Sequence, residues 1–442
     1  MVFFTFLYAE NYDTSDGIYD ANFLSFQKNE FISQHGDLLI SDIEVTGVKR
    51  TKKLFFSRIA KLKDDSKLSD FDPVLFVNEI NKRGILAEIS LDYKVLDGKA
   101  IIEVKAKDKW TLIPIPTISN SSSNSSFGLI LLETNFLGLN KMFGAGAVIS
   151  NNGNMFLLSY VDQNIFATNF MSMIALITST ATLENKEWQQ QSNDPYQEYK
   201  SRLDMAAYQL GYKFSSYFTP SVKVGYKNFK ISKSYEETLN PPENASVFSY
   251  GINTELDFQS YHDYFKYGLY ANFDIDITKF SSIEEHLNYN VYKFEGSYYH
   301  KLPNYGRLKF DTEAKVSDKM RPVLDQDRDA GSLGMYSLPS DTLLINDYAN
   351  VTLTFEQSIY IKPWGMITAS AFWEQGVFNG GFEYDAIDNT YKSGTSLHHY
   401  YAPGASVQLY FKDIAIPAIG FSYAYNMQSK EGLFKFVAGF AM

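Results

Sequence analysis

The stretch YFKYGLYANFDIDIT at residues 264–278 alternates apolar and polar side chains along most of its length. Its apolar positions are Phe265, Tyr267, Leu269, Ala271, Phe273, Ile275 and Ile277. A period of two identifies an extended strand with one apolar and one polar face. The stretch is longer than the five or six residues typical of soluble sheets. It suits a closed barrel in a bilayer, in which each tilted strand needs roughly nine to eleven residues.

Similar stretches recur from about residue 127 to the end of the chain. We predict strands at 127–135, 142–150, 153–161, 169–183, 200–214, 219–231, 246–259, 264–278, 288–301, 306–318, 348–361, 366–377, 404–412, 414–425 and 432–442. These are fifteen ranges, whereas single-chain bacterial barrels have an even number of strands. The expected fold is therefore a transmembrane antiparallel β-barrel of sixteen strands, one of which the pattern does not locate.

The predicted strand at 306–318 indicates what fills the barrel. Its charged side chains are Arg307, Lys309, Asp311, Glu313 and Lys315, and uncharged residues occupy the positions between them. A row of charges on one face of a strand cannot face lipid. We therefore expect this row to line a hydrated lumen.

The composition fits this interpretation. Hydrophobic residues make up 45% of the chain and aromatic residues 16%, with 35 Phe and 32 Tyr, yet the mean hydropathy is only −0.23. Such an aromatic excess is typical of the girdles at the two interfaces of a membrane barrel. A biased base composition of the coding sequence is the alternative explanation.

Several classes of function are disfavoured. The net charge of −11 argues against nucleic acid as the main partner. The absence of cysteine rules out disulfides, thiolate metal sites and a cysteine nucleophile. Neither a Gly-x-Ser-x-Gly nucleophile motif nor a phosphate-binding Gly-x-x-x-x-Gly-Lys loop occurs. We expect no enzymatic activity, no cofactor and no metal site.

The N-terminal residues precede the first predicted domain. The apolar run MVFFTFLYA at 1–9 resembles the clipped remnant of an export signal, and a disordered terminus is the equal alternative. Residues 10–37 read as a linker. Residues 163–183 carry no charge, but their apolar centre is too short for a membrane helix. We interpret that range as a barrel strand with its loop.

Residues 38–118 are predicted to form a small α+β domain. Asp72 as N-cap, Pro73 at the first helical position and Gly84 as stop define a helix. An Asp97–Gly98 turn between two alternating runs is a strong signal for a hairpin. The elements follow in the order strand, helix, helix, strand, strand, at 38–47, 51–61, 72–83, 89–96 and 100–107.

A run of serine and asparagine, SNSSSNSS at 119–126, follows this domain. Such a composition is typical of a flexible boundary. We therefore predict a linker at 119–126 and assign the barrel to 127–442, with a long loop at 319–347.

Several segments together resemble the outer-membrane assembly and translocation superfamily, the BamA- and TamA-like barrels of the bacterial surface antigen family. In LLETNFLGLNKMFG (131–144), Glu133, Asn135 and Gly138 match the family's Glu-x-Asn-x-x-Gly pattern in the first barrel strand. YVDQNIFATN (160–169), VTLTFEQS (351–358) and FWEQGVF (372–378) resemble later segments in the same order. VTGVKRTK (45–52) and LAEISLDYKV (86–95) resemble a polypeptide-transport-associated (POTRA) domain. The similarity extends over about residues 38–442.

The resemblance implies a barrel in the cell outer membrane with its single POTRA domain in the periplasm. Its partners would be outer-membrane lipid, extended client polypeptides and accessory lipoproteins, and we expect a monomer. A client would add to the free edge of the POTRA sheet, at Glu88, Ile89, Ser90, Leu91, Asp92, Tyr93, Lys94 and Val95. The seam between the first strand, 127–135, and the last, 432–442, would open sideways.

The loop at 319–347 departs from the family pattern. In the family, this loop folds into the lumen and carries a Val-Arg-Gly motif whose arginine pairs with carboxylates on neighbouring strands. Here no arginine follows Leu333 and Gly334. The alternating pattern points Glu356 and Glu374 inward, and a buried unpaired carboxylate is costly. We expect Arg328, or otherwise Arg321, to pair with them, and screening by water and lysine is the alternative.

The last strand, LFKFVAGFAM at 433–442, also departs from the family pattern, since Met442 replaces the usual terminal aromatic residue. We expect its recognition signal to comprise Phe434, Phe436, Gly439 and Phe440. The function expected is the insertion or translocation of client polypeptides. A passive porin-like channel and a membrane anchor for a periplasmic partner are the alternatives.

Overall fold

The computed structural model describes residues 35–63, 65–120, 125–151, 153–188, 195–234, 239–262, 264–328, 335, 337–338, 343–385, 390–415 and 418–438. Residues 1–34, and with them the predicted signal remnant and most of the predicted linker, lie outside these ranges. Within the described ranges no helix is both long enough and apolar enough to cross a membrane.

The N-terminal domain is a three-stranded sheet with two helices, as predicted. Its elements are β1 (Ile40–Thr46), α2 (Lys53–Ala60), α3 (Pro73–Arg83), β2 (Leu86–Leu96) and β3 (Lys99–Asp108). The sheet order is β1-β3-β2, with β3 parallel to β1 and antiparallel to β2. Asp72 caps α3 by accepting hydrogen bonds from the amides of Val74 and Leu75. Apolar side chains of both helices pack on the sheet to form the domain's core.

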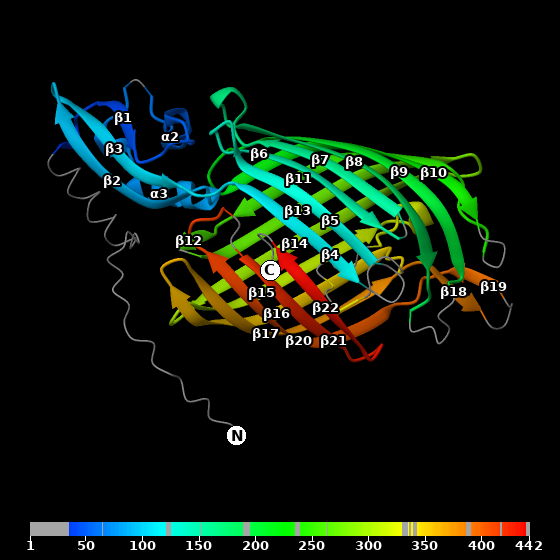
Figure 1. The fold of residues 1–442 in the computed structure, drawn as a ribbon. Helices are drawn as coiled ribbons and strands as arrows, with labels where there is room; N and C mark the ends of the chain where they lie inside the picture. Colours follow the sequence, from blue (N-terminus) through cyan, green and yellow to red (C-terminus); the bar gives the residue numbers. More distant parts are fainter. Residues whose placement is uncertain are drawn as a thin grey trace.

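The rest of the described chain forms a closed antiparallel barrel (Figure 1). Its sixteen long strands are β4 (Leu112–Asn120), β5 (Ser125–Phe136), β6 (Lys141–Ser150), β7 (Gly153–Asp162), β8 (Phe170–Asn185), β9 (Gln197–Tyr212), β10 (Phe218–Ser234), β11 (Ala245–Asp257), β13 (Phe265–Ser282), β14 (His286–Leu302), β15 (Gly306–Ser317), β16 (Asp347–Lys362), β17 (Gly365–Asn379), β20 (His398–Phe411), β21 (Ala418–Asn426) and β22 (Glu431–Ala438). The short β12 (Ser260–His262) pairs with the start of β13, and β18 (Phe382–Asp385) forms a separate hairpin with β19 (Thr390–Ser393). The predicted number of barrel strands is confirmed.

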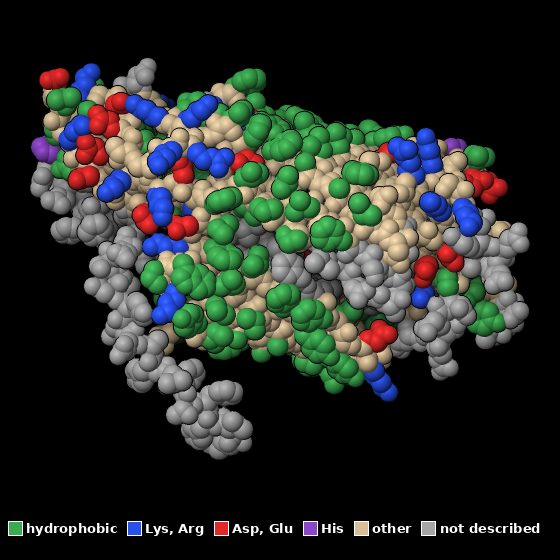
Figure 2. Space-filling view, in the orientation of Figure 1, with side chains coloured by type: hydrophobic (Ala, Val, Ile, Leu, Met, Phe, Trp, Pro, Cys, Tyr) green, Lys and Arg blue, Asp and Glu red, His purple; other side chains and the backbone are tan. Residues whose placement is uncertain are grey.

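The outer surface of the barrel is apolar. On β15, Leu308, Phe310 and Val316 are exposed, whereas Arg307 and Lys309 are buried inside. Hydrophobic side chains cover the middle of the barrel, and charged side chains gather on the N-terminal domain and at the opposite end (Figure 2). This apolar surface between two polar ends is what a bilayer requires, and the charged row faces the lumen as expected.

The barrel begins earlier than predicted. The sixteenth strand is β4, at Leu112–Asn120, and it pairs with β5 over nine residue pairs. Residues 112–118 therefore belong to the barrel and not to the N-terminal domain. Residues 119–120 and 125–126 of the predicted linker lie in strands, so this serine-rich run connects a hairpin. The prediction failed because Pro114 and Pro116 interrupt the strand pattern.

One end of the stretch at 264–278 also differs from the prediction. Leu269, Phe273, Ile275 and Ile277 are exposed on the outer surface, but Phe265 is buried. The ring of Phe265 lies 4.2 Å from the guanidinium of Arg307, which belongs to the lumen. The reason is Gly268, whose φ of +109° bends the strand next to the point where β12 begins, opposite Tyr267.

The connections differ at the two ends of the barrel. At the end next to the N-terminal domain they are short, as at 303–305 and 363–364. At the far end they include the long segments 318–346 and 380–397. Short turns on the periplasmic side and long loops outside are typical of outer-membrane barrels.

Candidate functional site

The candidate site begins at the seam where the barrel closes, between β4 and β22. Within the described residues, β4 extends over Leu112–Asn120 and β22 over Glu431–Ala438. The seam was expected between 127–135 and the last strand. That expectation was wrong, because β4 lies between β5 and β22.

The backbone of β4 is poor in hydrogen-bond donors on its seam side. The amide of Thr134 on β5 donates to the carbonyl of Thr111 at 3.0 Å, and the pairing of β4 with β5 continues without a register shift. In an antiparallel strand the backbone N–H and C=O groups of one residue point to one neighbouring strand, and those of the next residue point to the other. The backbone groups of odd-numbered residues of β4 therefore point to β5, and those of even-numbered residues point to β22. Pro114 and Pro116 therefore face the seam, and neither has an N–H to donate.

The seam is tied at the end next to the N-terminal domain. The amide of Trp110 donates to the carbonyl of Asp413 at 2.7 Å, and the amide of Ala415 donates to the carbonyl of Trp110 at 2.9 Å. Lys107 at the end of β3 also pairs with Asp413 at 3.0 Å. Residues 413–415 lie in the connection between β20 and β21. The chain leaving the N-terminal domain thus bridges from β4 across to the last strands.

The Glu-x-Asn-x-x-Gly residues hold the N-terminal domain against the barrel. Glu133 pairs with Arg50 at 2.8 Å. The Asn135 side chain donates to the Thr51 hydroxyl at 2.8 Å, and the Lys52 amide donates to the Gly138 carbonyl at 2.9 Å. A Cβ at Gly138 would lie 2.1 Å from the Arg50 carbonyl oxygen, so only glycine fits there. The motif is a docking contact for the loop between β1 and α2.

Asp108, the last residue of β3, organises the same loop. Its carboxylate accepts hydrogen bonds from the amides of Lys49 and Arg50 and from both the amide and the hydroxyl of Thr51. Burial alone would raise the pKa of Asp108, but these hydrogen bonds hold it below its usual value. The ionised carboxylate therefore favours the docked loop.

Helix α3 contacts the barrel further along the rim. Lys82 pairs with Asp257 at 3.2 Å, and Arg83 donates to the Gln163 side chain at 3.3 Å. Gln163 and Asp257 lie in or beside turns at the same end of the barrel. Together with the contacts at Glu133 and Asp413, these contacts place the domain on both sides of the seam.

Inside the barrel, the carboxylate of Glu356 is fully buried, and charged and hydroxyl side chains of nearby strands surround it. Its carboxylate lies 2.8 Å from Arg307 Nε and 3.0 Å from Lys309 Nζ. The Thr368 hydroxyl donates to it at 2.7 Å, and the Tyr410 hydroxyl lies 2.8 Å away. Four strands, β15, β16, β17 and β20, are thus joined through one carboxylate. Its inward orientation is as predicted.

The predicted pairing of a loop arginine with Glu356 is wrong in this structure, since Arg307 and Lys309 supply the positive charge. Arg328 instead donates to the side chains of Asn185 and Tyr199 on the far-end walls. Sequence reasoning missed the pairing although Arg307 stood in the recognised charged row. The missing information was the register that sets Arg307 opposite Glu356.

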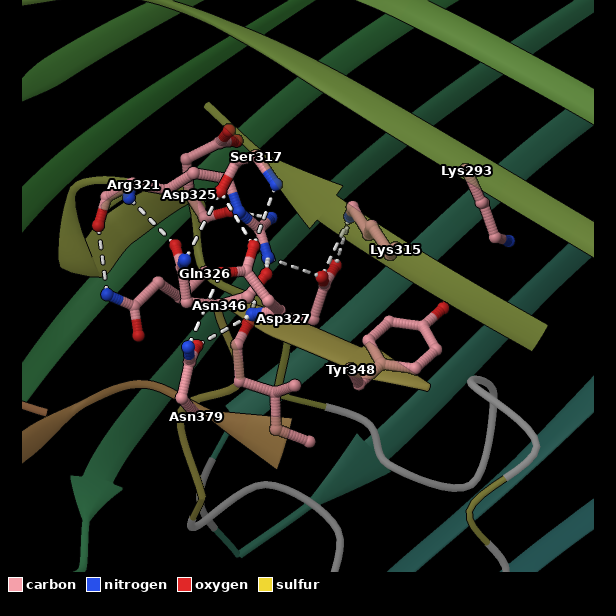
Figure 3. Close-up of polar contacts among 12 residues, drawn as sticks. Lys293, Lys315, Ser317, Arg321, Asp325, Gln326, Asp327, Asn346, Tyr348 and Asn379 are labelled. Carbon is pink, nitrogen blue, oxygen red and sulfur yellow. Dashed lines mark hydrogen bonds and ion pairs between the residues drawn. The ribbon is translucent and has the colours of Figure 1, made fainter. Parts of the chain in front are cut away.

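Arg321 holds the loop itself together (Figure 3). Its guanidinium, almost completely buried, donates to the Asp327 carboxylate at 2.9 Å and to the carbonyls of Asp325, Ile345 and Asn346. Lys315 on β15 also pairs with Asp327, at 2.7 Å. The two ends of the loop are thereby fastened to each other and to the barrel wall.

The loop also fixes itself to the lumen at two further places. Asp325 pairs with Lys227 of β10 at 2.7 Å and accepts a hydrogen bond from the Tyr289 hydroxyl. The Ser337 hydroxyl donates to the carboxylate of Glu374 at 2.9 Å. Glu374 is fully buried and faces inward, as predicted. An apolar cluster that includes Met335, Leu338 and Ile345 packs against β16, β17 and β20 at this end. The loop therefore crosses the far mouth of the barrel.

The lumen contains a cavity of about 380 Å³ nearer the N-terminal domain. Charged side chains of β13–β15 line one part of it, including Lys266, Glu295 and Asp311. Small hydroxyl and amide side chains of β16, β17 and β20 line another part, namely Asn350, Thr352, Thr354, Ser370, Ser406 and Gln408. Within the described ranges no group of three or more His, Cys, Asp or Glu side chains is arranged to hold a metal ion.

The remaining predicted site residues lie on two strands. Residues Glu88–Val95 belong to β2, an edge strand of the N-terminal sheet whose one partner among the described strands is β3. Phe434 is exposed on β22 and stacks on Phe421 at a centroid distance of 5.4 Å. The side chain of Phe436, and both Gly439 and Phe440, lie outside the described part of the structure.

These features define a class: a sixteen-stranded transmembrane-type β-barrel with a plugging loop and an N-terminal α+β domain docked beside its seam. No protein-family model and no curated protein sequence matches the chain. Its fold is nevertheless shared with solved BamA and CdiB structures. BamA from Haemophilus ducreyi lacking POTRA domains 1–3 is 14% identical, with a TM-score of 0.53 over 91% of this chain and 84% of that chain.

Two further structures share the fold. CdiB from Acinetobacter baumannii is 13% identical, with a TM-score of 0.59 over 91% of this chain and 73% of that chain. CdiB from Escherichia coli is 11% identical, with a TM-score of 0.54 over 91% of this chain and 74% of that chain. The expected likeness to a BamA- and TamA-like barrel is confirmed at the level of the fold.

Proposed function

We propose that this chain inserts or translocates client polypeptides at the outer membrane by opening its barrel sideways between β4 and β22. The observation that carries the proposal is the pair of prolines on the seam side of β4. A barrel that must stay shut gains from a complete hydrogen-bond ladder. Two missing donors on one side of β4 weaken the ladder at that junction.

The N-terminal domain serves as the receiving site in this proposal. It is a POTRA domain in the periplasm, and clients add to β2 along Glu88–Val95 through backbone hydrogen bonds. The domain contacts the barrel on both sides of the seam, through Glu133 and Asp413. A client bound to β2 is therefore delivered beside the junction that opens. No catalytic step and no cofactor is part of this function.

A passive channel is the competing function, and the charged lumen is the feature that favoured it. The loop fastened by Arg321 crosses the far mouth, and the domain covers part of the other rim. Both features oppose a permanently open pore. In planar bilayers we expect small conductance from the purified full chain. Large, steady conductance that does not respond to clients would favour the channel.

The test of the seam is a double variant, Pro114→Ile with Pro116→Val, which supplies two N–H donors. Each added hydrogen bond contributes about 0.5–1.5 kcal/mol, so the open state becomes roughly 5- to 150-fold rarer. We expect cells that depend on this variant to lose one or more outer-membrane barrel proteins, as cells depleted of the chain do. The matched control is Pro403→Ile, which adds a donor within β20, away from the seam.

The readout is a mass-spectrometric inventory of the outer membrane. An inventory that depletion of the chain leaves unchanged would overturn the proposed function. Suppose that depletion of the chain reduces barrel proteins but the double variant does not. The proposed function would then be kept, but opening at the β4–β22 seam would not be part of it.

A further inference from the structure

One segment of the N-terminal domain is strongly basic. Residues 48–63, which include helix α2 and the loop before it, contain seven Lys and Arg side chains and no Asp or Glu. Arg50 pairs with Glu133, and Lys53 pairs with Asp42. We define the basic patch as four of the other five side chains, namely Lys49, Lys52, Arg58 and Lys61. Within the described ranges none of these four forms an ion pair.

The far end of the domain, where β1 and β3 begin, has paired charges instead. Lys94 pairs with Glu44 at 2.6 Å and with Glu103 at 2.9 Å. Lys67 pairs with Asp37 at 3.0 Å. The basic patch lacks such carboxylate partners, so its positive charge remains available to an anion from outside the chain.

The basic patch lies along the rim of the barrel. At one end, the Lys52 amide donates to the carbonyl of Gly138, in the turn between β5 and β6. At the other end, burial lowers the pKa of Lys213, the residue after β9, to about 7, and the positive charges of Arg83 and Lys61 contribute to that shift. Helix α2 therefore extends over the rim from β5 towards β9. Figure 2 shows Lys and Arg side chains of the domain beside the apolar outer surface of the barrel.

The same part of the rim carries aromatic side chains on its outside. Phe170 and Phe214 are exposed, and both pack on Tyr212, with ring centroids 4.9 and 4.8 Å apart. Phe166, in the turn between β7 and β8, is 93% exposed. In membrane barrels such aromatic girdles lie at the level of the lipid headgroups. The basic patch is therefore next to the headgroups of the leaflet on the side of the N-terminal domain.

Helix α2 directs its basic side away from the domain. Phe55 and Phe56 are buried in the core of the domain, whereas Leu54 and Lys61 are exposed. The exposed side of the helix therefore combines positive charge with one apolar side chain. Segments that rest on a membrane surface combine the same two features.

We propose that the basic patch binds the phosphate headgroups of an anionic phospholipid leaflet and holds the N-terminal domain on the membrane beside the barrel. A cluster of at least four Lys and Arg side chains next to a membrane is typical of anionic-lipid binding, and each favours binding about fivefold. The inference does not depend on opening of the seam or on any client. It adds a lipid-binding surface to the N-terminal domain.

The first experiment places a fluorophore at Ser57→Cys in the full chain, which has no native cysteine. Ser57 lies four residues from both Lys53 and Lys61, on the exposed side of α2. The protein is reconstituted into vesicles that carry a headgroup-linked quencher and contain phosphatidylcholine, either alone or with about one-third phosphatidylglycerol. We expect at least twofold stronger quenching with phosphatidylglycerol, and loss of the difference at high salt, because salt screens the attraction.

A fluorophore at Leu96→Cys, an exposed position at the far end of β2, is the control and should be quenched weakly in both kinds of vesicle. Equal quenching at Ser57→Cys in the two kinds of vesicle would overturn the proposal and leave an acidic protein surface as the alternative occupant. Loss of the quenching on addition of inorganic phosphate at constant ionic strength would also overturn it, by identifying a site for free phosphate.

The second experiment neutralises the patch with Lys49→Gln, Lys52→Gln and Lys61→Gln together. In phosphatidylglycerol vesicles the ratio of bound to unbound domain should fall roughly 100-fold. The matched control is Lys67→Gln, Lys94→Gln and Lys99→Gln, which removes the same charge at the far end of the domain and should leave the quenching unchanged. The heat-dependent shift in gel mobility checks that the barrel is folded. A folded patch variant that is quenched like the parent protein refutes the proposal.

Discussion

The seam and the wall around Glu356 are built in contrasting ways. The fixed wall is formed by β13–β17 and β20, and one buried carboxylate, Glu356, joins four of its strands. At the seam, Pro114 and Pro116 remove two hydrogen-bond donors from β4. A closed barrel can therefore concentrate its stability in one part of its wall and leave another junction easier to separate.

The largest expected effect comes from removing the centre of the fixed wall. Glu356→Ala leaves Arg307 and Lys309 buried without their carboxylate, which should cost about 3–5 kcal/mol of unfolding free energy. Glu356→Gln should cost less, because its amide oxygen can still accept hydrogen bonds. Urea unfolding in detergent, followed by gel mobility, measures both variants.

The control for this prediction is Asp385→Ala on the β18–β19 hairpin, which breaks the more exposed pair with Lys392. A surface pair contributes about 0–1 kcal/mol. If Glu356→Ala unfolds at the same urea concentration as this control, the buried Glu356 cluster does not contribute more to barrel stability than a surface ion pair.

Sequence reasoning located most of the fixed wall but little of the seam. Long alternating strands such as β13 and β16 give a clear period-two signal. The strand β4 was missed because two prolines in nine residues argue against a strand. The same two prolines distinguish the seam. The residues that obscured the strand signal in the sequence are therefore the residues on which the proposed opening of the seam depends.

Contacts between distant segments were also out of reach of the sequence. The inward direction of Glu356 follows from local alternation, but its partner Arg307 is identified by the register between β15 and β16. The role of Glu133, Asn135 and Gly138 in docking the N-terminal domain likewise depends on a tertiary contact with residues 50–52. The local alternation of residues predicts which face of a strand a side chain occupies, but it does not predict which residue of another segment that side chain contacts.

The next largest effect concerns the loop above the fixed wall. Arg321→Ala removes a buried guanidinium and leaves Asp327 and three carbonyls without its hydrogen bonds. We expect the loop to loosen and single-channel conductance to rise severalfold in planar bilayers. Arg202→Ala is the control, because Arg202 makes a partly exposed pair with Asp204 on β9. Unchanged conductance in Arg321→Ala would mean that this arginine does not hold the plug.

A moderate effect is expected at the docking contact beside the seam. Gly138→Ala places a Cβ 2.1 Å from the Arg50 carbonyl oxygen and strains a φ of +72°. Gly98→Ala is the matched control, since Gly98 has a φ of +73° but nothing lies within 4 Å of its Cβ position. Both variants carry a backbone cost of about 1–2 kcal/mol, and Gly138→Ala alone should detach the domain. Limited proteolysis of the full chain should then cleave faster between the domain and the barrel.

The smallest effect is a dependence of docking on pH through Asp108. Because hydrogen bonds from residues 49–51 lower its pKa in the docked state, the ionised carboxylate stabilises docking above pH ~4, the ordinary range of an aspartate. This contribution is lost as the pH falls through the lowered pKa. Spin labels on Asp65→Cys and Asn304→Cys, in a chain with no native cysteine, should give one sharp distance at pH 6 and a broader distribution near pH 3. In Asp108→Asn the amide cannot ionise, so the distribution should be broader at pH 6 and change less on acidification. An identical acid response in both proteins would assign the pH dependence to other groups at the rim.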